Sequence, residues 1–134
     1  MYVRPGDMVV TQGNGARLLL VEDDPAIADV YAFPLRLAGY EVEIAPDGEA
    51  ALKALEEHPP AMMLLDIRLP KLDGLQVLER LRAAGNNLPV VVLSNHMDSE
   101  TIRRAYELGA IEYLIKSQVT PTALRSRLPE LLVS

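Results

Sequence analysis

Short apolar runs recur along the chain from Arg17 onward, and segments of mixed polarity separate them. Five of these runs have the length of a strand, at residues 18–21, 42–45, 61–65, 90–93 and 111–115. Several show no alternation of polar and apolar residues, which indicates strands that are covered on both faces. Strands of this kind are typical of a parallel sheet that lies between two layers of helices.

The segments between these runs carry apolar residues at helical spacing. We expect three buried helix faces, formed by Ile27, Val30, Tyr31 and Leu35, by Leu75, Leu78 and Leu81, and by Ile102, Ala105 and Tyr106. Residues suited to cap a helix start stand before these segments and before a last one: Asp24, Asp73, Ser99 and Thr120. Glycines stand where three of the helices should end: Gly39, Gly85 and Gly109.

Together these signals predict five β–α units in series. The fold class is therefore α/β, with a doubly wound five-stranded parallel sheet, right-handed crossovers and helices on both faces. The domain should span residues 17–134, and residues 1–16, which are rich in turn chemistry, should form an N-terminal arm. Two prolines conflict with long helices, so we expect a bend at Pro34 in the first helix and a short or broken last helix at Pro129.

The composition excludes several classes of function. The 134 residues include 19 acidic and 13 basic side chains and no cysteine, for a net charge of −6. An acidic chain repels phosphate backbones, so we expect no direct binding of nucleic acid. No apolar run approaches the roughly 18 residues that a membrane helix needs. Because a secretory signal is also missing at the N-terminus, we expect a cytoplasmic protein without membrane contact.

Polar side chains follow four of the five apolar runs. In an open parallel sheet, ligands bind at the carboxyl ends of the strands, so these side chains should gather at one edge. Each has a plain explanation alone, such as a solvated loop acid or a surface lysine. Asp66 is different, because it ends a run that looks buried and an unpaired carboxylate there is costly. The candidate site residues are Glu22, Asp23, Asp66, Ser94 and Lys116.

Three carboxylates at one edge would repel one another unless a cation joined them. Mg²⁺ suits such ligands, because it binds hard oxygens and completes its shell with water and phosphate oxygens. Lys116 supplies a point charge that can reach Asp66 or a phosphoryl oxygen, and Ser94 offers a hydroxyl to the same oxygens. Transfer of a phosphoryl group onto an aspartate requires groups of this kind.

The same residues resemble a known family over about residues 17–132. The apolar run that precedes Glu22-Asp23-Asp24-Pro25, and the segment Asp66-Ile67-Arg68-Leu69-Pro70-Lys71-Leu72-Asp73-Gly74, are similar to motifs of the receiver domains of bacterial two-component response regulators. The spacing from Ser94 to Lys116 and the aromatic Tyr113 also match that pattern. The resemblance implies the flavodoxin-like (βα)5 receiver fold.

The resemblance also implies roles for these residues. Asp66 would be the phosphoacceptor for a sensor histidine kinase or a phosphotransfer protein, in a signalling protein that catalyses at most its own phosphorylation and autodephosphorylation. Mg²⁺ would be bound by Asp23 directly, by Glu22 through water, by Asp66 and by the backbone carbonyl of Arg68. Lys116 would hold the phosphoryl oxygens.

In that family a switch follows phosphorylation. Ser94 would move toward the phosphoryl group and Tyr113 would turn inward, which remodels the fourth helix and the fifth strand. The face of the fourth helix, fifth strand and fifth helix would then contact an output partner or domain, or a second copy in a homodimer. An ordinary solvated charged face explains the same residues equally well. They are Arg103, Arg104, Tyr106, Lys116 and Gln118.

Three features depart from the family pattern. Ser117 stands where a proline with a cis bond is usual, so we expect a trans bond and an altered loop. The segment from Asp66 to Ser94 is slightly short, which should trim the third helix or its exit. Arg68 and His96 each lie two residues beyond those positions, where the family tunes phosphoryl lifetime. We hypothesise that Arg68 covers the phosphoryl group and slows the attack of water.

Several other functions fit less well. A phosphatase similar to the haloacid dehalogenase group needs a second acid where Arg68 stands, and a flavin carrier needs a glycine-rich phosphate loop after the first strand. Ser94, His96 and Asp98 are too closely spaced for a hydrolase triad, and the chain has no nucleophile elbow. We expect His58 and His96 to be surface residues rather than metal ligands. A receiver-like interaction module that works without phosphorylation remains the alternative.

Overall fold

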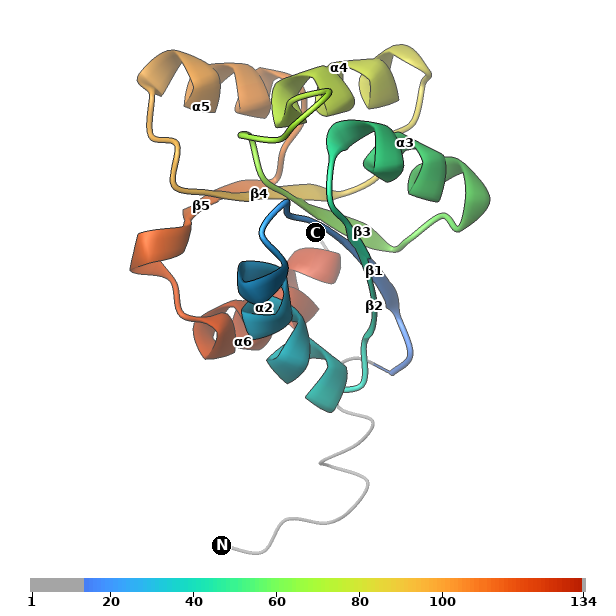
Figure 1. The fold of residues 1–134 in the computed structure, drawn as a ribbon, viewed down its shortest axis with the longest axis vertical. Helices are drawn as coiled ribbons and strands as arrows, with labels where there is room; N and C mark the ends of the chain where they lie inside the picture. The colour runs from blue at the N-terminus through green and yellow to red at the C-terminus, as the bar shows by residue number, and fades with distance from the viewer. Residues whose placement is uncertain (1–13, 134) are drawn as a thin grey trace, which may run out of the picture.

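The computed structural model describes residues 14–133, which form a sheet of five parallel strands with helices on both sides (Figure 1). The strands are β1 (Arg17–Val21), β2 (Glu41–Ala45), β3 (Met62–Leu65), β4 (Val90–Ser94) and β5 (Glu112–Ile115). The helices are α2 (Pro25–Leu37), α3 (Gly48–Glu57), α4 (Gly74–Ala83), α5 (Ser99–Glu107) and α6 (Pro121–Leu132), with a short 3₁₀ helix η1 (Lys116–Gln118) after β5. The predicted α/β fold is therefore confirmed.

The order of the strands across the sheet is β2-β1-β3-β4-β5. Because the chain passes from β1 to β2 on one side of it and then to β3, β4 and β5 on the other, helices cover both faces. In Figure 1, α3, α4 and α5 lie on one face, and α2 and α6 lie on the other. Alternate residues of the central strands enter the two cores, as Leu19 does on the α3 side and Leu18 on the α2 side.

The ends of the helices follow local signals in the sequence. Asp24, Asp73 and Thr120 cap α2, α4 and α6 as predicted, each by accepting hydrogen bonds from amides of the first turn. The cap of α5 was predicted one residue too late, because Asp98 accepts from Thr101 N and Ser99 is already helical. Left-handed glycines follow α2, α4 and α5 as predicted, at Gly39, Gly85 and Gly109.

Both prolines lie inside continuous helices. The predicted short or broken last helix is wrong, because α6 runs through Pro129 to Leu132. Burial of Leu128 and Leu131 on either side of Pro129 offsets the missing amide donor. Helix α2 likewise continues through Pro34. This proline lies near the end of the helix, and only one turn follows it. Its Ala38 amide still bonds to the carbonyl of Pro34.

The buried face of α2 matches the prediction at Tyr31 and Leu35 but not at Ile27 and Val30. Ala28, Tyr31, Ala32 and Leu35 face the core, whereas Ile27 and Val30 are 37% and 56% exposed. The two alanines let α2 approach the sheet closely, which turns the larger aliphatic side chains toward solvent. Tyr106 of α5, which was placed both on a helix face with Ile102 and Ala105 and on the partner surface, is 46% exposed. The face of Leu75, Leu78 and Leu81 on α4 does pack against the core as predicted.

The predicted N-terminal arm, residues 1–16, lies mainly outside the described residues. Asn14, Gly15 and Ala16 are described, and the last two bond to the segment after α2: Gly15 N donates to Gly39 O, and Ala16 O accepts from Glu41 N. Among residues 14–133, no helix has the length and apolar character needed to span a membrane.

Candidate functional site

The predicted site residues gather at the carboxyl edge of the sheet. Glu22 and Asp23 follow β1, Asp66 follows β3, Ser94 ends β4 and Lys116 follows β5. They line one open hollow of about 500 Å³. The parallel register of the four strands brings these residues together although they are far apart in sequence. The other residues that line it are Asp24, Ile27, Arg68, Asn95 and His96.

Lys116 joins two buried carboxylates at the centre of the hollow. Its Nζ lies 2.6 Å from Asp66 Oδ2, and it also donates to Glu22 Oε1. The side chains of Lys116, Glu22 and Asp66 are only 10%, 4% and 8% exposed. One cation is thus shared by two carboxylates, which leaves this cluster with a net negative charge. A buried charge without a partner is costly, so this excess charge destabilises the cluster.

Burial and hydrogen bonding have opposite effects on the pKa of each group in this cluster. Desolvation raises the pKa of the Glu22 carboxyl above its usual value, although hydrogen bonds from Lys116 and from Asp24 N oppose that shift. For Lys116, desolvation lowers the pKa, but hydrogen bonds to Asp66 and Glu22 outweigh it and the net shift is upward. Lys116 therefore stays charged, and the cluster favours a further cation near Glu22.

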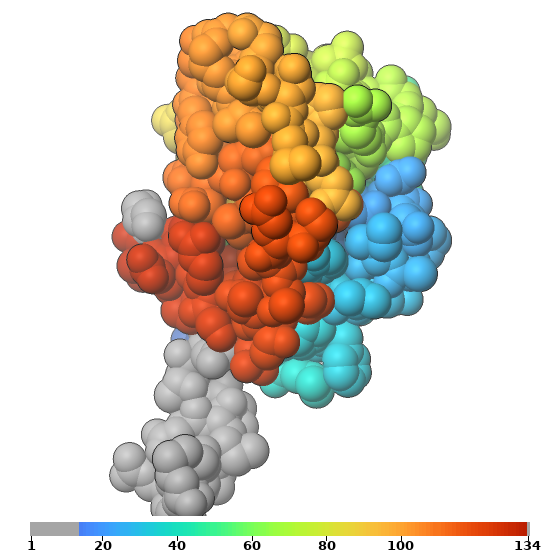
Figure 2. Space-filling model, turned by 90° about the vertical axis from the view of Figure 1, so that its left-hand side faces the viewer, coloured from blue at the N-terminus to red at the C-terminus, as the bar shows by residue number. Residues whose placement is uncertain are grey.

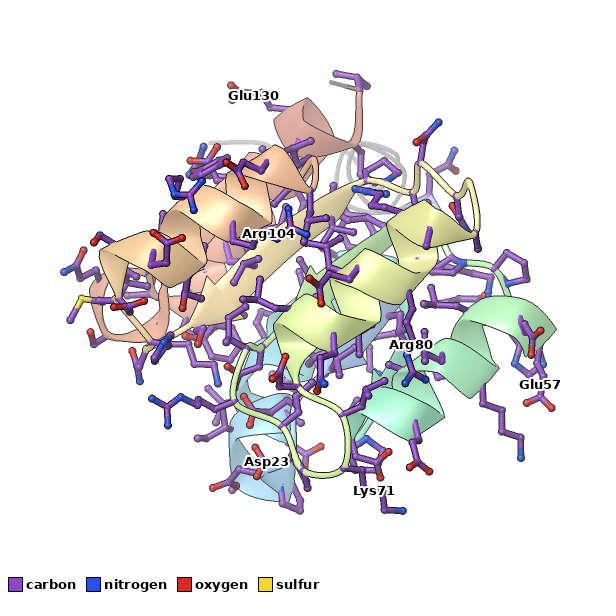
Figure 3. The ribbon with its side chains drawn as sticks, turned by 90° about the horizontal axis from the view of Figure 1, so that it is seen from above. Asp23, Glu57, Lys71, Arg80, Arg104 and Glu130 are labelled. Atoms are coloured by element: carbon purple, nitrogen blue, oxygen red, sulfur yellow. The ribbon has the colours of Figure 1, made fainter. Side chains whose placement is uncertain are left out.

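A third carboxylate adjoins this pair. Oxygens of Glu22, Asp23 and Asp66 all lie within 4.8 Å of one another, and Asp23 is exposed where the other two are buried. Asp23 lies beside the start of α2, on the same side of the molecule as Lys71 (Figure 3). Three convergent carboxylate oxygens with one side open to water fit a hard divalent cation such as Mg²⁺, which keeps several waters.

The loop that carries Asp66 is held by close packing. A Cβ on Gly74 would stand 2.1 Å from the backbone oxygen of Asp66, and one on Gly48 would stand 2.0 Å from that of Leu72. Gly74 N also donates to Ile67 O at 2.8 Å, and Ile67 N donates to Asp66 Oδ1 at 2.7 Å. The start of α4 thus packs directly against the backbone of Asp66, and the Ile67 amide fixes the direction of its carboxylate.

The same loop turns through Lys71, which has a left-handed backbone with φ of 67°. The ammonium group of Lys71 lies 3.7 Å from Asp47 Oδ2 in the residue that caps α3. This pair and the Gly48–Leu72 contact both attach the loop to α3. The sequence suggested neither contact, because each joins segments that are distant along the chain.

Ser94 and Tyr113 both form hydrogen bonds with the backbone of His96. Ser94 is 1% exposed, and its Oγ accepts from His96 N at 3.1 Å. The Tyr113 hydroxyl donates to His96 O at 2.5 Å. Burial, and then the charges of Asp66 and Asp98, raise the pKa of Tyr113 to about 12. The phenol of Tyr113 therefore remains a neutral donor at physiological pH.

His96 was predicted to be a surface residue rather than a metal ligand; it lines the open hollow, and the prediction did not include the contacts of its ring. Its ring is half-buried and lies between Arg68 and Thr101, with Nδ1 3.0 Å from the Arg68 guanidinium and Nε2 3.2 Å from Thr101 Oγ1. The ring does not meet the Ser94 hydroxyl, which bonds to the backbone instead, so no hydrolase triad forms. The other histidine, His58, is 60% exposed as predicted.

The predicted partner face of α5, β5 and α6 is exposed except at one residue. Figure 2 shows the surface of α5 continuing into that of the η1 segment. The side chains of Arg103 and Arg104 are 54% and 42% exposed, and Arg104 also pairs with Glu79 of α4. Figure 3 shows the position of Arg104 on α5. Lys116 does not belong to this face, because its side chain is buried against Glu22 and Asp66.

Solved structures show the same fold. A receiver domain protein (CheY-like) from Methanospirillum hungatei JF-1 superimposes with a TM-score of 0.83 at 30% identity, over 89% of this chain and 94% of that one. The BeF3-activated N-terminal receiver domain of Klebsiella pneumoniae RstA gives 0.79 at 30% identity, over 88% and 99%. Fold and acidic edge together place the chain among the phosphate-handling α/β domains of the receiver type.

Sequence comparison identifies the family. A model of the response regulator receiver domain matches residues 18–128. Transcriptional regulatory protein PrrA of Mycobacterium tuberculosis is 41% identical over 100 residues, which cover 75% of this chain and 43% of that protein. Response regulator MprA of Mycobacterium ulcerans is 41% identical over 101 residues, which cover 75% and 43%. The chain belongs to the response regulator receiver domain family, and it spans less than half the length of these relatives.

Proposed function

We propose that Asp66 accepts a phosphoryl group from a phosphohistidine on a sensor histidine kinase or a phosphotransfer protein. The observation that carries this proposal is the arrangement at the centre of the hollow, where the Asp66 carboxylate lies 2.6 Å from Lys116 beside two further acids. Receiver domains act as signalling modules of two-component systems, and this chain is such a domain.

The residues suit an in-line transfer. A carboxylate oxygen of Asp66 attacks phosphorus, the bond from phosphorus to the histidine nitrogen breaks, and that nitrogen leaves with the electron pair. Lys116 stays charged and balances the oxygens of the arriving group, while Ile67 N keeps the Asp66 carboxylate directed into the hollow. Water can later reverse the modification by attack on the acyl phosphate, which would be the autodephosphorylation of this domain.

The three acids fit a magnesium ion, which would neutralise charge on the phosphoryl oxygens during transfer. Asp23 and Asp66 would bind it directly, Glu22 through water, and the backbone carbonyl of Arg68 would complete the protein ligands. The convergence of the three carboxylates supports this assignment, because a cation would relieve their repulsion. The raised pKa of Glu22 also supports it, because burial deprives the ionised carboxylate of water and a cation would stabilise that form.

A response to phosphorylation would pass through Ser94 and Tyr113. The buried Ser94 hydroxyl lines the same hollow as Asp66, and it would donate to a phosphoryl oxygen. Tyr113 already contacts the chain next to Ser94, so a shift of that segment would reach β5 and α5. The exposed face with Arg103, Arg104, Tyr106 and Gln118 would then contact an output domain, a separate partner or a second copy.

The phosphodonor would approach over α2. Ile27 and Val30 are exposed and border a second hollow of about 300 Å³, which also reaches Lys116. This surface offers an apolar contact directly beside the reacting carboxylate. Such donors act in the cytoplasm, and membership of the family supports the same location for this domain.

Labelling with acetyl phosphate and Mg²⁺ tests the proposal. We expect the label at Asp66 in the parent protein and its loss in Asp66→Asn. A matched control is Asp73→Asn, because Asp73 lies in the same loop and asparagine caps a helix as well as aspartate does. Equal labelling of Asp66→Asn and the parent would contradict the proposal.

A further inference from the structure

His96 uses all four of its polar groups in the described structure. Its backbone N donates to Ser94 Oγ at 3.1 Å, and its carbonyl accepts from the Tyr113 hydroxyl at 2.5 Å. Its ring Nδ1 lies 3.2 Å from Arg68 Nε and 3.0 Å from the terminal nitrogen of the same guanidinium, and its Nε2 lies 3.2 Å from Thr101 Oγ1. One residue therefore contacts both sides of the hollow and the start of α5.

The hydrogen bonds fix the tautomer of the His96 ring. Arginine has donors only, so Nδ1 must be the unprotonated acceptor in its contact with Arg68. The Thr101 hydroxyl donates to Asp98 Oδ2 at 3.1 Å, so it accepts from the ring and Nε2 must carry the proton. The acceptor role of Nδ1 requires a neutral ring, and the donor role of Nε2 agrees with the tautomer that this leaves.

The far end of this chain of contacts is the cap of α5. Asp98 Oδ2 accepts from both the backbone N and the hydroxyl of Thr101, and these bonds close the first turn. A bonded path therefore runs from Arg68, through the ring of His96 and Thr101, to Asp98. Arg68 begins this path at the wall of the hollow that contains Asp66.

We propose that His96 is a positioning residue that couples the state of Asp66 to the first turn of α5. The proposal rests on the proposed function of Asp66. A phosphoryl group is a far stronger acceptor for a guanidinium than a neutral imidazole nitrogen, so it would take Arg68 from Nδ1. It would also take the Ser94 hydroxyl from His96 N. His96 would then lose its bonds to Arg68 and Ser94 together and keep its bonds to Thr101 and Tyr113.

The resting arrangement can be tested without any phosphoryl group. Nitrogen-15 spectra of the ring should show a neutral His96 with its proton on Nε2, and the Arg68 Nε–H should be slow to exchange. In His96→Leu, which keeps the backbone contacts but has no ring nitrogen, the Arg68 Nε–H should exchange at least several times faster. A ring proton on Nδ1, or an unchanged Arg68 exchange rate, would overturn the proposal.

The coupling can be tested with beryllofluoride and Mg²⁺ as the phosphoryl mimic. In the parent protein we expect clear shifts of the Thr101 and Ile102 amide signals on addition. In His96→Leu, the mimic should still bind at Asp66 within about threefold of the parent affinity, a difference of about 0.65 kcal/mol. The Thr101 and Ile102 shifts should fall to less than half, and His58→Leu, the same change at an exposed histidine, should behave like the parent.

His96→Asn provides a second variant, because its side-chain oxygen can replace Nδ1 as the acceptor for Arg68 but cannot reach Thr101. It should restore slow exchange at Arg68 and still lack the full response of α5. Parent-like α5 shifts in His96→Leu would overturn the coupling while the role of Asp66 stands. No binding of the mimic to the parent protein would refute the proposed function instead, and the exchange measurements would still decide the resting contacts of His96.

Discussion

Removal of the Lys116 charge tests whether this side chain balances the negative charges of Glu22 and Asp66. Lys116→Met keeps the length and most of the apolar stem of the side chain but leaves Glu22 and Asp66 facing each other without a cation. All three side chains are at most 10% exposed, so this is a buried cluster rather than a surface pair. Breaking such a pair by removing one partner costs about 3–5 kcal/mol, and we expect a loss of free energy of unfolding in that range at pH 7 without metal.

The pH dependence of this loss follows from the pKa shift. The pKa of Lys116 is raised in the folded protein, so its stabilisation is fully present below the ordinary value of 10.5 and is lost as the pH rises through the higher folded value. The difference between parent and variant should therefore be constant near neutral pH and shrink above pH 10.5. Urea unfolding followed by circular dichroism at a series of pH values measures it.

A matched control is Arg127→Met, because Arg127 pairs with Glu112 at 3.5 Å with the two side chains 41% and 31% exposed. An exposed pair of this kind contributes at most about 1 kcal/mol. A loss below about 1 kcal/mol for Lys116→Met as well would show that the buried cluster is not balanced by Lys116, and the electrostatic reasoning for this site would be refuted. Magnesium should restore part of the stability of Lys116→Met, since it would supply the missing positive charge.

Three further results are expected. Glu22→Gln should raise the free energy of unfolding at neutral pH, because the raised pKa of Glu22 means that its ionised form destabilises the fold above its usual pKa. The same change should weaken binding of Mg²⁺. Denaturation and calorimetry measure the two effects, and a fall in the free energy of unfolding would contradict the first. Gly74→Ala should cost about 1–3 kcal/mol in thermal unfolding, because the new Cβ would meet the Asp66 backbone, and an unchanged melting temperature would contradict this. Tyr113 should titrate near 12 by ultraviolet absorbance, and Asp66→Asn should lower that value because one cause of the shift is removed.

The strand pattern made most of the fold and the central site predictable. Continuous apolar runs identified all five strands to within one or two residues, and parallel order then placed the residues after them at one edge. That step required no knowledge of side-chain packing, because the carboxyl ends of parallel strands always meet. Asp66 and Lys116 could be paired on this basis although they are 50 positions apart.

Features that depend on packing could not be predicted in the same way. Helical periodicity alone could not tell that alanines, rather than Ile27 and Val30, would face the sheet from α2. The penalty for proline inside a helix was correct as a local rule, but burial of Leu128 and Leu131 overrides it in α6. At the start of α5, Asp98 and Ser99 are both good caps, and only the structure distinguishes them.

His96 shows why the contacts of a site residue can escape prediction even when its position is noted. Its place two residues after Ser94 mirrored that of Arg68 after Asp66, which was the only signal in the sequence that the two could meet. The contact itself depends on the close pairing of β3 with β4, which brings their following loops together. Its partner Thr101 carried no signal at all, because a threonine in the first turn of a helix is ordinary.

Fluorine NMR with beryllofluoride can decide whether Asp66, the neighbouring acids and Lys116 form one magnesium-dependent phosphoacceptor site. We expect bound fluoride signals for the parent protein with Mg²⁺, and none after chelation or in Asp66→Asn. Bound signals that persist in Asp66→Asn, or a parent protein that gives none with Mg²⁺ present, would contradict such a site.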